Sequence, residues 1–421
     1  MRRLNGEQLY GLRRLMATLK MGRNKALKKL SLKQKLALNY VSKESKLTRI
    51  DGKIYSNTFT PYFPSVAYDR FLKGVIQVAQ GQPLPVVTNF AVTPRCPCRC
   101  WHCSFADRSQ KDVLSLKQLQ TSIAEVQALG ASVIGLTGGE PLLRNDLEDI
   151  VASIDRRSMP ILFTTGYKLT AVRVQRLQKA GLAIPVVSLD HYDPERHDKG
   201  RGRQGMHATA LQAIRLFQDA GMYVAVSFVP DRRLVSDRDE LFKTIEFFRD
   251  LGINDMRLTS PILSGHLTER PEELLSAENV QTLFEVQKKC TQTPGYPGVF
   301  AYDYFESERY YGCGAGYNYM FIDSQGNVCP CDFTMMSFGN ILQRPLTEIW
   351  NETSEHFKVP GFVCYANQSA EFLAGLKPQH WPVGRQTTQA VLKACPSYDL
   401  KRLPEFYKRM GMPVDKFASH P

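Results

Sequence analysis

The chain has 421 residues, of which 43% are hydrophobic and 10% aromatic. This composition excludes a disordered protein and allows a large buried core. Ten cysteines are too few for a disulfide scaffold at this length, and their clustering indicates metal binding in a reducing compartment. Because no apolar run approaches about 20 residues, we expect neither a membrane span nor a secretory signal. A cytoplasmic protein is therefore predicted.

The net charge of +13 is concentrated in residues 1–50, which hold fourteen Lys and Arg but only two acidic residues. Apolar residues recur there at helical spacing, which predicts a basic amphipathic helix: Leu9, Leu12, Met16 and Leu19. Three interpretations are open: helices packed on the body, a nucleic-acid site, or contact with an anionic membrane. Nucleic acid is not expected, because residues 11–39 contain no aromatic side chain for stacking. We favour peripheral attachment to the inner face of a membrane.

Residues 51–85 are interpreted as a connector, after which strand and helix patterns alternate. Strands are predicted at 86–93, 132–137, 160–165, 184–189, 223–229 and 253–258. Ser115 opens the first intervening helix with a capping box, and Gly130 ends it. Six such units predict an α/β fold with a parallel sheet, namely a partial (β/α)6 TIM-like barrel. The predicted domains are 1–85, the barrel at 86–265, a linker and helix at 266–298, and a C-terminal extension of short hairpins at 299–421.

The strongest motif lies directly after the first predicted strand, where Cys96, Cys100 and Cys103 have the spacing C-x3-C-x2-C. Thiolates are suitable ligands for iron–sulfur clusters or zinc. Three cysteines on one loop can bind three irons of a [4Fe–4S] cluster and leave the fourth iron open. Zinc is disfavoured because zinc sites usually use two ligand pairs, and no second pair lies nearby in the sequence. We expect no role for Cys98.

A second motif, Thr-Gly-Gly-Glu-Pro, ends the second predicted strand at residues 137–141. Loops at the carboxyl ends of parallel strands line the ligand site of such folds. Gly138 and Gly139 allow the backbone to approach a ligand closely, and Glu140 is an acceptor for an ammonium group.

The two motifs together resemble those of the radical S-adenosylmethionine (SAM) superfamily, over roughly residues 86–260. This resemblance implies that Cys96, Cys100 and Cys103 hold the catalytic [4Fe–4S] cluster, whose free iron is chelated by SAM. It implies that Gly138, Gly139 and Glu140 hold the methionyl amine of SAM. His102 stands where the family usually has an aromatic residue.

Later segments extend the resemblance. It implies that Ser188 and Asp190 contact the SAM ribose or the substrate, and that Arg201 meets the SAM carboxylate. Thr165 stands where relatives often have Asn, and this departure weakens the case for a polar role at that position.

The C-terminal cysteines resemble the SPASM/twitch extension, which binds auxiliary [4Fe–4S] clusters. The resemblance implies one auxiliary cluster on Cys313, Cys331 and Cys364, with Cys395 or Cys329 as the fourth ligand. Asn367 replaces a cysteine that a second auxiliary cluster would need. The alternative is that these residues are buried free cysteines, as we expect for Cys290.

These observations predict a radical SAM enzyme that cleaves SAM reductively to a 5′-deoxyadenosyl radical and removes hydrogen from an organic substrate. A reductant such as flavodoxin or ferredoxin is implied, and the reaction subclass stays open. The basic N-terminus favours a lipid or membrane-derived substrate. The alternatives are a radical SAM peptide maturase and a non-catalytic iron–sulfur electron-transfer protein. Many peptide-modifying relatives have strands at the N-terminus, and the pattern of residues 1–50 predicts none.

Overall fold

The computed structural model describes residues 5–105, 111–378, 380–397, 399 and 401–413. Its centre is an open ten-stranded sheet with the order β10-β9-β8-β7-β6-β5-β4-β11-β12-β13. The six predicted barrel strands are present as consecutive parallel neighbours: β4 (Val87–Thr93), β5 (Val133–Gly138), β6 (Met159–Thr164), β7 (Ile184–Ser188), β8 (Ala225–Phe228) and β9 (Asp255–Leu258). The predicted partial barrel is therefore confirmed.

Strands from the C-terminal part extend both edges of this sheet. They are β10 (Gly298–Ala301), β11 (Tyr319–Ile322), β12 (Asn327–Cys329) and β13 (Gly339–Asn340). β10 runs parallel to β9, and β11 runs parallel to β4. The predicted extension thus shares one sheet with the barrel, and the domain boundaries given above stay a prediction.

Helices of the barrel region pack on one face of the sheet, where Ile134, Leu162 and Val226 belong to the main core. The other face packs on residues 50–67 and lines the two cavities described below, so the strands are largely buried on both sides, as parallel strands generally are. The helices of the barrel region and its linker are α4 (Leu116–Leu129), α5 (Leu147–Ala152), α6 (Ala171–Ala180), α7 (Pro194–Arg201), α8 (Met206–Asp219), α9 (Arg232–Ser236), α10 (Arg238–Asp250) and α11 (Ala277–Gln292). Short 3-10 helices lie at Pro141–Leu143, Gly265–Leu267 and Pro271–Glu273. α4 begins with the predicted capping box of Ser115 and Gln118, and Gly130 ends it with a φ of 137°.

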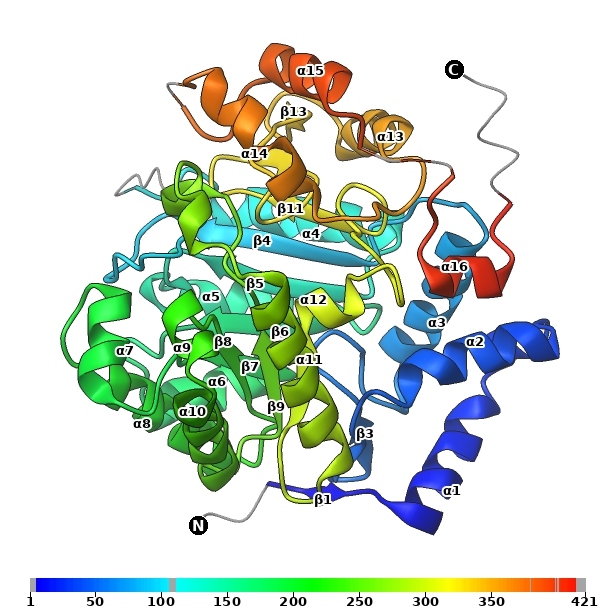
Figure 1. Cartoon of the computed structure of the whole chain (residues 1–421), viewed down its shortest axis with the longest axis vertical. Helices are drawn as coiled ribbons and strands as arrows, with labels where there is room; N and C mark the ends of the chain where they lie inside the picture. The colour runs from blue at the N-terminus through cyan, green and yellow to red at the C-terminus, as the bar shows by residue number, and fades with distance from the viewer. Residues whose placement is uncertain (1–4, 106–110, 379, 398, 400, 414–421) are drawn as a thin grey trace.

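Three C-terminal helices lie above one edge of the sheet in Figure 1: α13 (Leu346–His356), α14 (Tyr365–Gly375) and α15 (Arg385–Ala394). The short helix α12 (Tyr302–Phe305) lies near the centre of that view, and α16 (Glu405–Met410) lies at its right, near α3 (Val66–Ala79). α16 reaches back to the N-terminal region, where Gln34 Nε2 donates a hydrogen bond to the Met410 carbonyl at 2.9 Å.

The N-terminal segment contains strands, so the prediction of none in residues 1–50 is wrong. β1 (Glu7–Gln8), β2 (Thr48–Ile50) and β3 (Lys53–Tyr55) form a three-stranded antiparallel sheet. Helix α1 (Gly11–Gly22), a 3-10 turn (Lys25–Leu27) and α2 (Leu32–Ser42) lie between β1 and β2, and α3 (Val66–Ala79) follows β3. Sequence pattern misses β1 because it is two residues long and pairs with a strand forty residues away.

Candidate iron–sulfur and SAM site

The three cysteines of the C-x3-C-x2-C motif line one cavity beyond the carboxyl end of β4. This smaller cavity has a volume of about 190 Å³, and Cys96, Cys100 and Cys103 all contribute to its wall. Arg201 Nη1 donates to Cys100 Sγ at 3.6 Å. A hydrogen bond from Cys98 and the charge of Arg201 hold the pKa of Cys100 well below its usual value. Cys100 therefore favours the thiolate form that binds metal.

The Gly-Gly dipeptide is pressed against the chain that leads into the cysteine loop. A Cβ at Gly138 would lie 2.4 Å from the Thr93 carbonyl oxygen, and a Cβ at Gly139 would lie 2.0 Å from that of Arg95. The Gly139 N–H donates to the Thr93 carbonyl at 2.7 Å, and the Glu140 N–H donates to the Arg95 carbonyl at 2.7 Å. Only glycine, which has no Cβ, allows this approach, so the Gly-Gly motif determines the position of this part of the cavity wall.

Glu140 lies behind that wall, where it is fully buried. Its Oε1 accepts hydrogen bonds from Thr164 Oγ1 at 2.6 Å and from the Leu142 N–H at 3.1 Å. Its Oε2 accepts from the Thr165 N–H at 2.7 Å and from the Thr165 hydroxyl. Burial raises the pKa of Glu140, while these hydrogen bonds oppose the rise. In this structure Glu140 supports Thr164 and Thr165, which line the cavity, and does not line it itself.

Two sequence-based expectations change as a result. The carboxylate of Glu140, expected at the methionyl amine of SAM, is directed toward protein donors. Thr165, for which the sequence weakened the case for a polar role, makes two hydrogen bonds to this carboxylate.

Arg201, Ser188 and His102 all line the smaller cavity, whereas Asp190 lies behind Arg201. Asp190 Oδ2 forms an ion pair with Arg201 Nη2 at 2.6 Å, and Asp190 Oδ1 accepts from the Val229 N–H at 3.1 Å. Burial and the neighbouring Arg201 charge lower the pKa of His102 to about 4, so this imidazole is neutral near pH 7. Its Nδ1 is buried and has no hydrogen-bond partner in the described part of the chain.

Three C-terminal cysteines share the wall of a second, larger cavity of about 480 Å³. They are Cys313, Cys331 and Cys364, as the SPASM-like pattern predicted. Burial raises the pKa of Cys313 to about 11. Burial also raises the pKa of Cys364, and the charges of Cys313 and Cys331 raise it further, which places the three thiols in one electrostatic neighbourhood.

Neither predicted fourth ligand lines this larger cavity. Cys329, in β12, is fully buried and packs with Ala91, Phe105 and Phe321. Cys395 caps the C-terminal end of α15, and its carbonyl accepts a hydrogen bond from the Tyr365 hydroxyl at 2.8 Å. The structure thus brings together three of the proposed ligands and leaves both candidates for the fourth outside the cavity wall.

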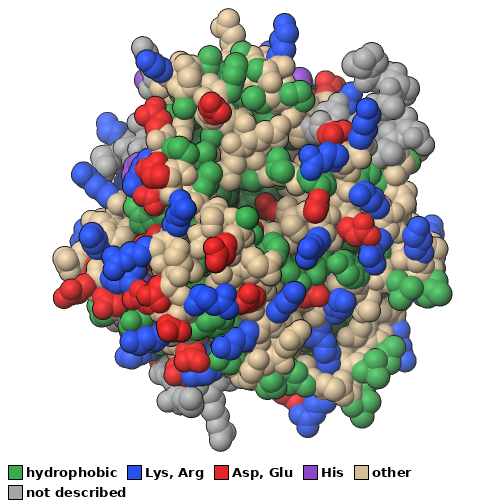
Figure 2. Space-filling model, in the orientation of Figure 1, with side chains coloured by type: hydrophobic (Ala, Val, Ile, Leu, Met, Phe, Trp, Pro, Cys, Tyr) green, Lys and Arg blue, Asp and Glu red, His purple; other side chains and the backbone are tan. Residues whose placement is uncertain are grey.

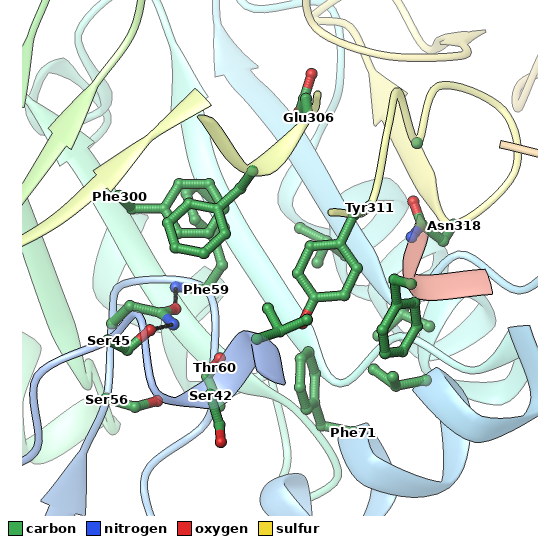
Figure 3. Close-up of a pocket in the computed structure, with 18 of the residues that line it drawn as sticks. Ser42, Ser45, Ser56, Phe59, Thr60, Phe71, Phe300, Glu306, Tyr311 and Asn318 are labelled. Carbon is green, nitrogen blue, oxygen red and sulfur yellow. Dashed lines mark hydrogen bonds between the residues drawn. The ribbon is translucent and has the colours of Figure 1, made fainter. Parts of the chain in front are cut away.

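The larger cavity is mainly apolar, and its charged lining residues come from the N-terminal helices and from the barrel and C-terminal part. Figure 3 shows Phe59, Phe71, Phe300 and Tyr311 around its space, with Glu306 beyond the aromatic rings. Burial and the nearby Asp303 raise the pKa of Glu306 to about 8, opposed by Arg257. Glu306 could not be recognised from sequence, because an acidic residue at a helix end is usually solvated.

The two cavities meet, because both are lined by Arg257, Ile262, Asp332 and Phe333. Arg257 Nε donates to the Tyr302 hydroxyl at 3.0 Å. Asp332 Oδ2 accepts from the Tyr319 hydroxyl at 2.8 Å and from Asn89 Nδ2 at 2.9 Å.

The sequence analysis overlooked this junction, although one signal was available. Arg257 and Asn89 are strongly polar residues inside the buried strands β9 and β4. Such residues require polar partners, so their presence can indicate a polar site within the barrel.

The smaller cavity fits an iron–sulfur cluster with an organic cofactor beside it. It offers three cysteines, a buried arginine, an unpartnered imidazole nitrogen and a backbone wall that excludes any Cβ. Among the described residues, no group of three or more His, Cys, Asp or Glu side chains could hold a single metal ion. The fold and both cysteine sites define an α/β partial-barrel enzyme of iron–sulfur chemistry.

Comparison with known proteins identifies the family. The model of the radical SAM superfamily matches residues 90–231, and that of an iron–sulfur cluster-binding domain, SPASM, matches residues 313–368. The chain is therefore a radical SAM enzyme with a SPASM domain, and it uses SAM and [4Fe–4S] clusters. When bound, these cofactors supply one-electron cleavage of SAM and thereby an agent that removes a hydrogen atom from substrate.

Relatives of known function are moderately similar. An AdoMet-dependent heme synthase of Methanosarcina barkeri is 28% identical over 300 residues, which cover 65% of this chain and 84% of the synthase. The PqqA peptide cyclase of Granulibacter bethesdensis is 25% identical over 274 residues, covering 62% of this chain and 72% of the cyclase. Among solved structures, Streptococcus suis SuiB bound to precursor peptide SuiA has a TM-score of 0.55 and 17% identity, covering 70% and 72% of the two chains. This last similarity concerns the fold.

The structure also bears on membrane contact. Within the described residues, no helix is both long and apolar enough to span a bilayer.

Proposed function

We propose that this radical SAM enzyme modifies a peptide. The observation that carries the proposal is the meeting of the two cavities at Arg257 and Asp332. A side chain of a peptide in the larger cavity can reach this junction, next to the SAM-binding residues, and present a hydrogen atom there. The rest of the peptide can stay in the larger cavity, which also borders the C-terminal cysteines.

The named relatives support a peptide better than the lipid preferred from sequence, since one of them is a peptide cyclase and none is named for a lipid. The expectation that counted against a peptide was the absence of strands in residues 1–50, and β1 and β2 lie within that segment. This objection therefore no longer holds.

The residues at the junction have separate tasks in this proposal. Arg257 offers donors to a peptide carbonyl or carboxylate, and Asp332 is held in place by Tyr319 and Asn89. Cys96, Cys100 and Cys103 hold the SAM-cleaving cluster, while Arg201 is ion-paired with Asp190 at that site. The aromatic rings around the larger cavity exclude water from a reactive substrate.

A second candidate is the conversion of a heme precursor. It is favoured by the 28% identity to a heme synthase, which exceeds that to the peptide cyclase. The aromatic lining of the larger cavity suits a flat apolar ring system as well as it suits a peptide.

The test uses anaerobically reconstituted enzyme with SAM, a reductant and peptides encoded by genes adjacent to its own. We expect 5′-deoxyadenosine formation to rise with the correct peptide and the mass of that peptide to change. The matched control replaces Cys96, Cys100 and Cys103 with Ala, which should abolish both signals. If peptides remain unchanged while an iron-porphyrin precursor is converted, the second candidate is correct. If an extracted lipid alone is converted, both candidates are wrong.

A further inference from the structure

The amphipathic helices at the N-terminus expose their apolar residues instead of burying them. The exposed fractions are high: Leu12 71%, Leu15 54%, Met16 63% and Leu19 60% on α1, with Leu32 74% and Leu36 59% on α2. Figure 2 shows apolar side chains at the lower right of this face, where Figure 1 places α1 and α2. Leu9, predicted to share the stripe, is buried and precedes α1.

Helix geometry places this stripe away from the body of the protein. An α-helix turns by about 100° per residue, so Ala17, the buried residue of α1, lies about 140° to 160° around the helix from Leu12 and Leu19. On α2, Leu36 lies about 100° to 140° from the buried Ala37 and Val41. In the described residues of α1 and α2, the helices therefore pack on the body through Ala17, Ala37 and Val41, whereas the apolar stripe itself does not.

Positive charge surrounds the stripe. Nine of the fourteen basic residues in this segment are exposed: Arg13, Lys20, Arg23, Lys25, Lys28, Lys29, Lys33, Lys35 and Lys43. Others are committed to internal contacts, since Lys46 Nζ donates to the Tyr296 carbonyl at 2.8 Å and Arg49 pairs with Glu7 at 3.3 Å. Arg2 and Arg3 lie outside the described residues.

We propose that the outward faces of α1 and α2 form a docking surface for an anionic lipid bilayer. The docking surface comprises the six exposed apolar residues and seven of the exposed basic residues named above, all except Lys35 and Lys43, which line the larger cavity. Apolar side chains can enter the acyl boundary while Lys and Arg contact lipid phosphates, a combination typical of interfacial helices. A second copy of the chain is a poor occupant, because the same positive charges would face each other.

The larger cavity lies on the inner side of the same helices. Arg14, Thr18 and Met21 of α1, and Lys35 and Leu38 of α2, line it. Docking by the outer faces would therefore leave the cavity lining intact and hold the larger cavity close to the membrane surface. This inference goes beyond the proposed function, because it concerns where the enzyme acts and not which bond it changes.

The test is co-sedimentation of the full-length holoenzyme with vesicles of phosphatidylcholine alone or mixed with phosphatidylglycerol. The docking variant carries Leu12→Ser, Met16→Ser and Leu19→Ser. The matched control carries Val172→Ser, Leu342→Ser and Leu376→Ser, which are exposed elsewhere on the protein. Iron content and SAM cleavage, which both variants should retain, report on folding.

We expect wild type and control to bind the phosphatidylglycerol vesicles and not the neutral ones. The docking variant should bind at least tenfold more weakly. Raising the salt from about 0.1 M to about 1 M should also weaken wild-type binding, because the Debye length falls from about 10 Å to about 3 Å.

Three results would overturn the proposal. The first is equal binding of wild type to neutral and anionic vesicles, or equal anionic binding by the docking variant. The second is a wild type that does not bind vesicles but binds an acidic peptide, together with a docking variant that binds this peptide more weakly. The surface would then be a peptide site. The third is a wild-type dimer that the docking variant dissociates.

Discussion

The close contact between Gly139 and the chain before Cys96 makes Gly139→Ala the most informative single substitution. The new Cβ would lie 2.0 Å from the Arg95 carbonyl oxygen and 2.5 Å from its carbonyl carbon. Both are backbone atoms, so no side-chain rotation relieves the clash, and either the Gly-Gly turn or the cysteine loop must move. Such movement also disturbs the 2.7 Å hydrogen bond from the Glu140 N–H to Arg95.

The expected cost combines these two effects. Overpacking typically costs about 1–3 kcal/mol, and loss of one hydrogen bond about 1 kcal/mol, so we expect a loss of about 2–4 kcal/mol. If displacement of the cavity wall removes half of this amount, about 1–2 kcal/mol, from the free energy of SAM binding, SAM affinity falls by about fivefold to thirtyfold. A change of 1.4 kcal/mol corresponds to a factor of ten.

Urea unfolding and equilibrium dialysis with SAM measure these two quantities under anaerobic conditions. Gly375→Ala is the matched control, because Gly375 ends α14 and a Cβ there meets no atom within 4 Å. This control should keep wild-type stability and SAM affinity. If Gly139→Ala behaves like Gly375→Ala in both assays, the tight approach does not shape the site and the reasoning fails.

Three further predictions concern the clusters, Glu140 and pH. Replacing Cys313 and Cys331 with Ala should lower the iron content from about eight to about four per chain, whereas Cys395→Ala should leave it unchanged; an unaltered double variant refutes the auxiliary site. Glu140→Gln should lower the free energy of unfolding by about 1–3 kcal/mol, because an amide NH₂ then faces buried donors; weaker SAM binding at unchanged stability would instead support direct contact. Burial raises the pKa of Asp255 from 3.8 to about 6, so the folded protein holds a proton on this carboxyl more tightly than the unfolded chain does. The contribution of Asp255 to the free energy of unfolding therefore falls as pH rises from about 4 to 6. Asp255→Asn should remove up to about 3 kcal/mol of the change in unfolding free energy over this pH range, measured by urea unfolding. If the variant shows the same pH dependence as wild type, other groups cause that dependence.

The N-terminal region shows where sequence patterns fail. The spacing of Leu12, Met16 and Leu19 correctly predicted a helix, because helical periodicity is local. The pairing of β1 with β2 was missed, since each strand is too short to show alternation and the two are distant in the chain. The same pattern also could not indicate which side of α1 faces solvent, because that depends on what packs against Ala17.

In the candidate site, too, local features could be predicted from sequence and those that depend on distant contacts could not. The Cys96–Cys103 loop, the Gly-Gly turn and the Cys313–Cys331 spacing were recognisable from sequence, because a cluster or a tight turn requires particular residues within one short segment. The direction of the Glu140 carboxylate was not recognisable, since most of its hydrogen-bond donors belong to Thr164 of β6 and to Thr165, which follows it.

The sequence by itself determined the chemistry and the order of the barrel strands. Ligand spacing and strand periodicity are properties of contiguous residues, and they need no knowledge of the rest of the chain. Only the tertiary structure decided that Arg257 and Asp332 join the two cavities, that Cys329 and Cys395 lie outside the larger one, and that α1 presents its leucines to solvent. Each of these features depends on contacts between segments far apart in sequence, and such contacts are fixed by the packing of the whole core.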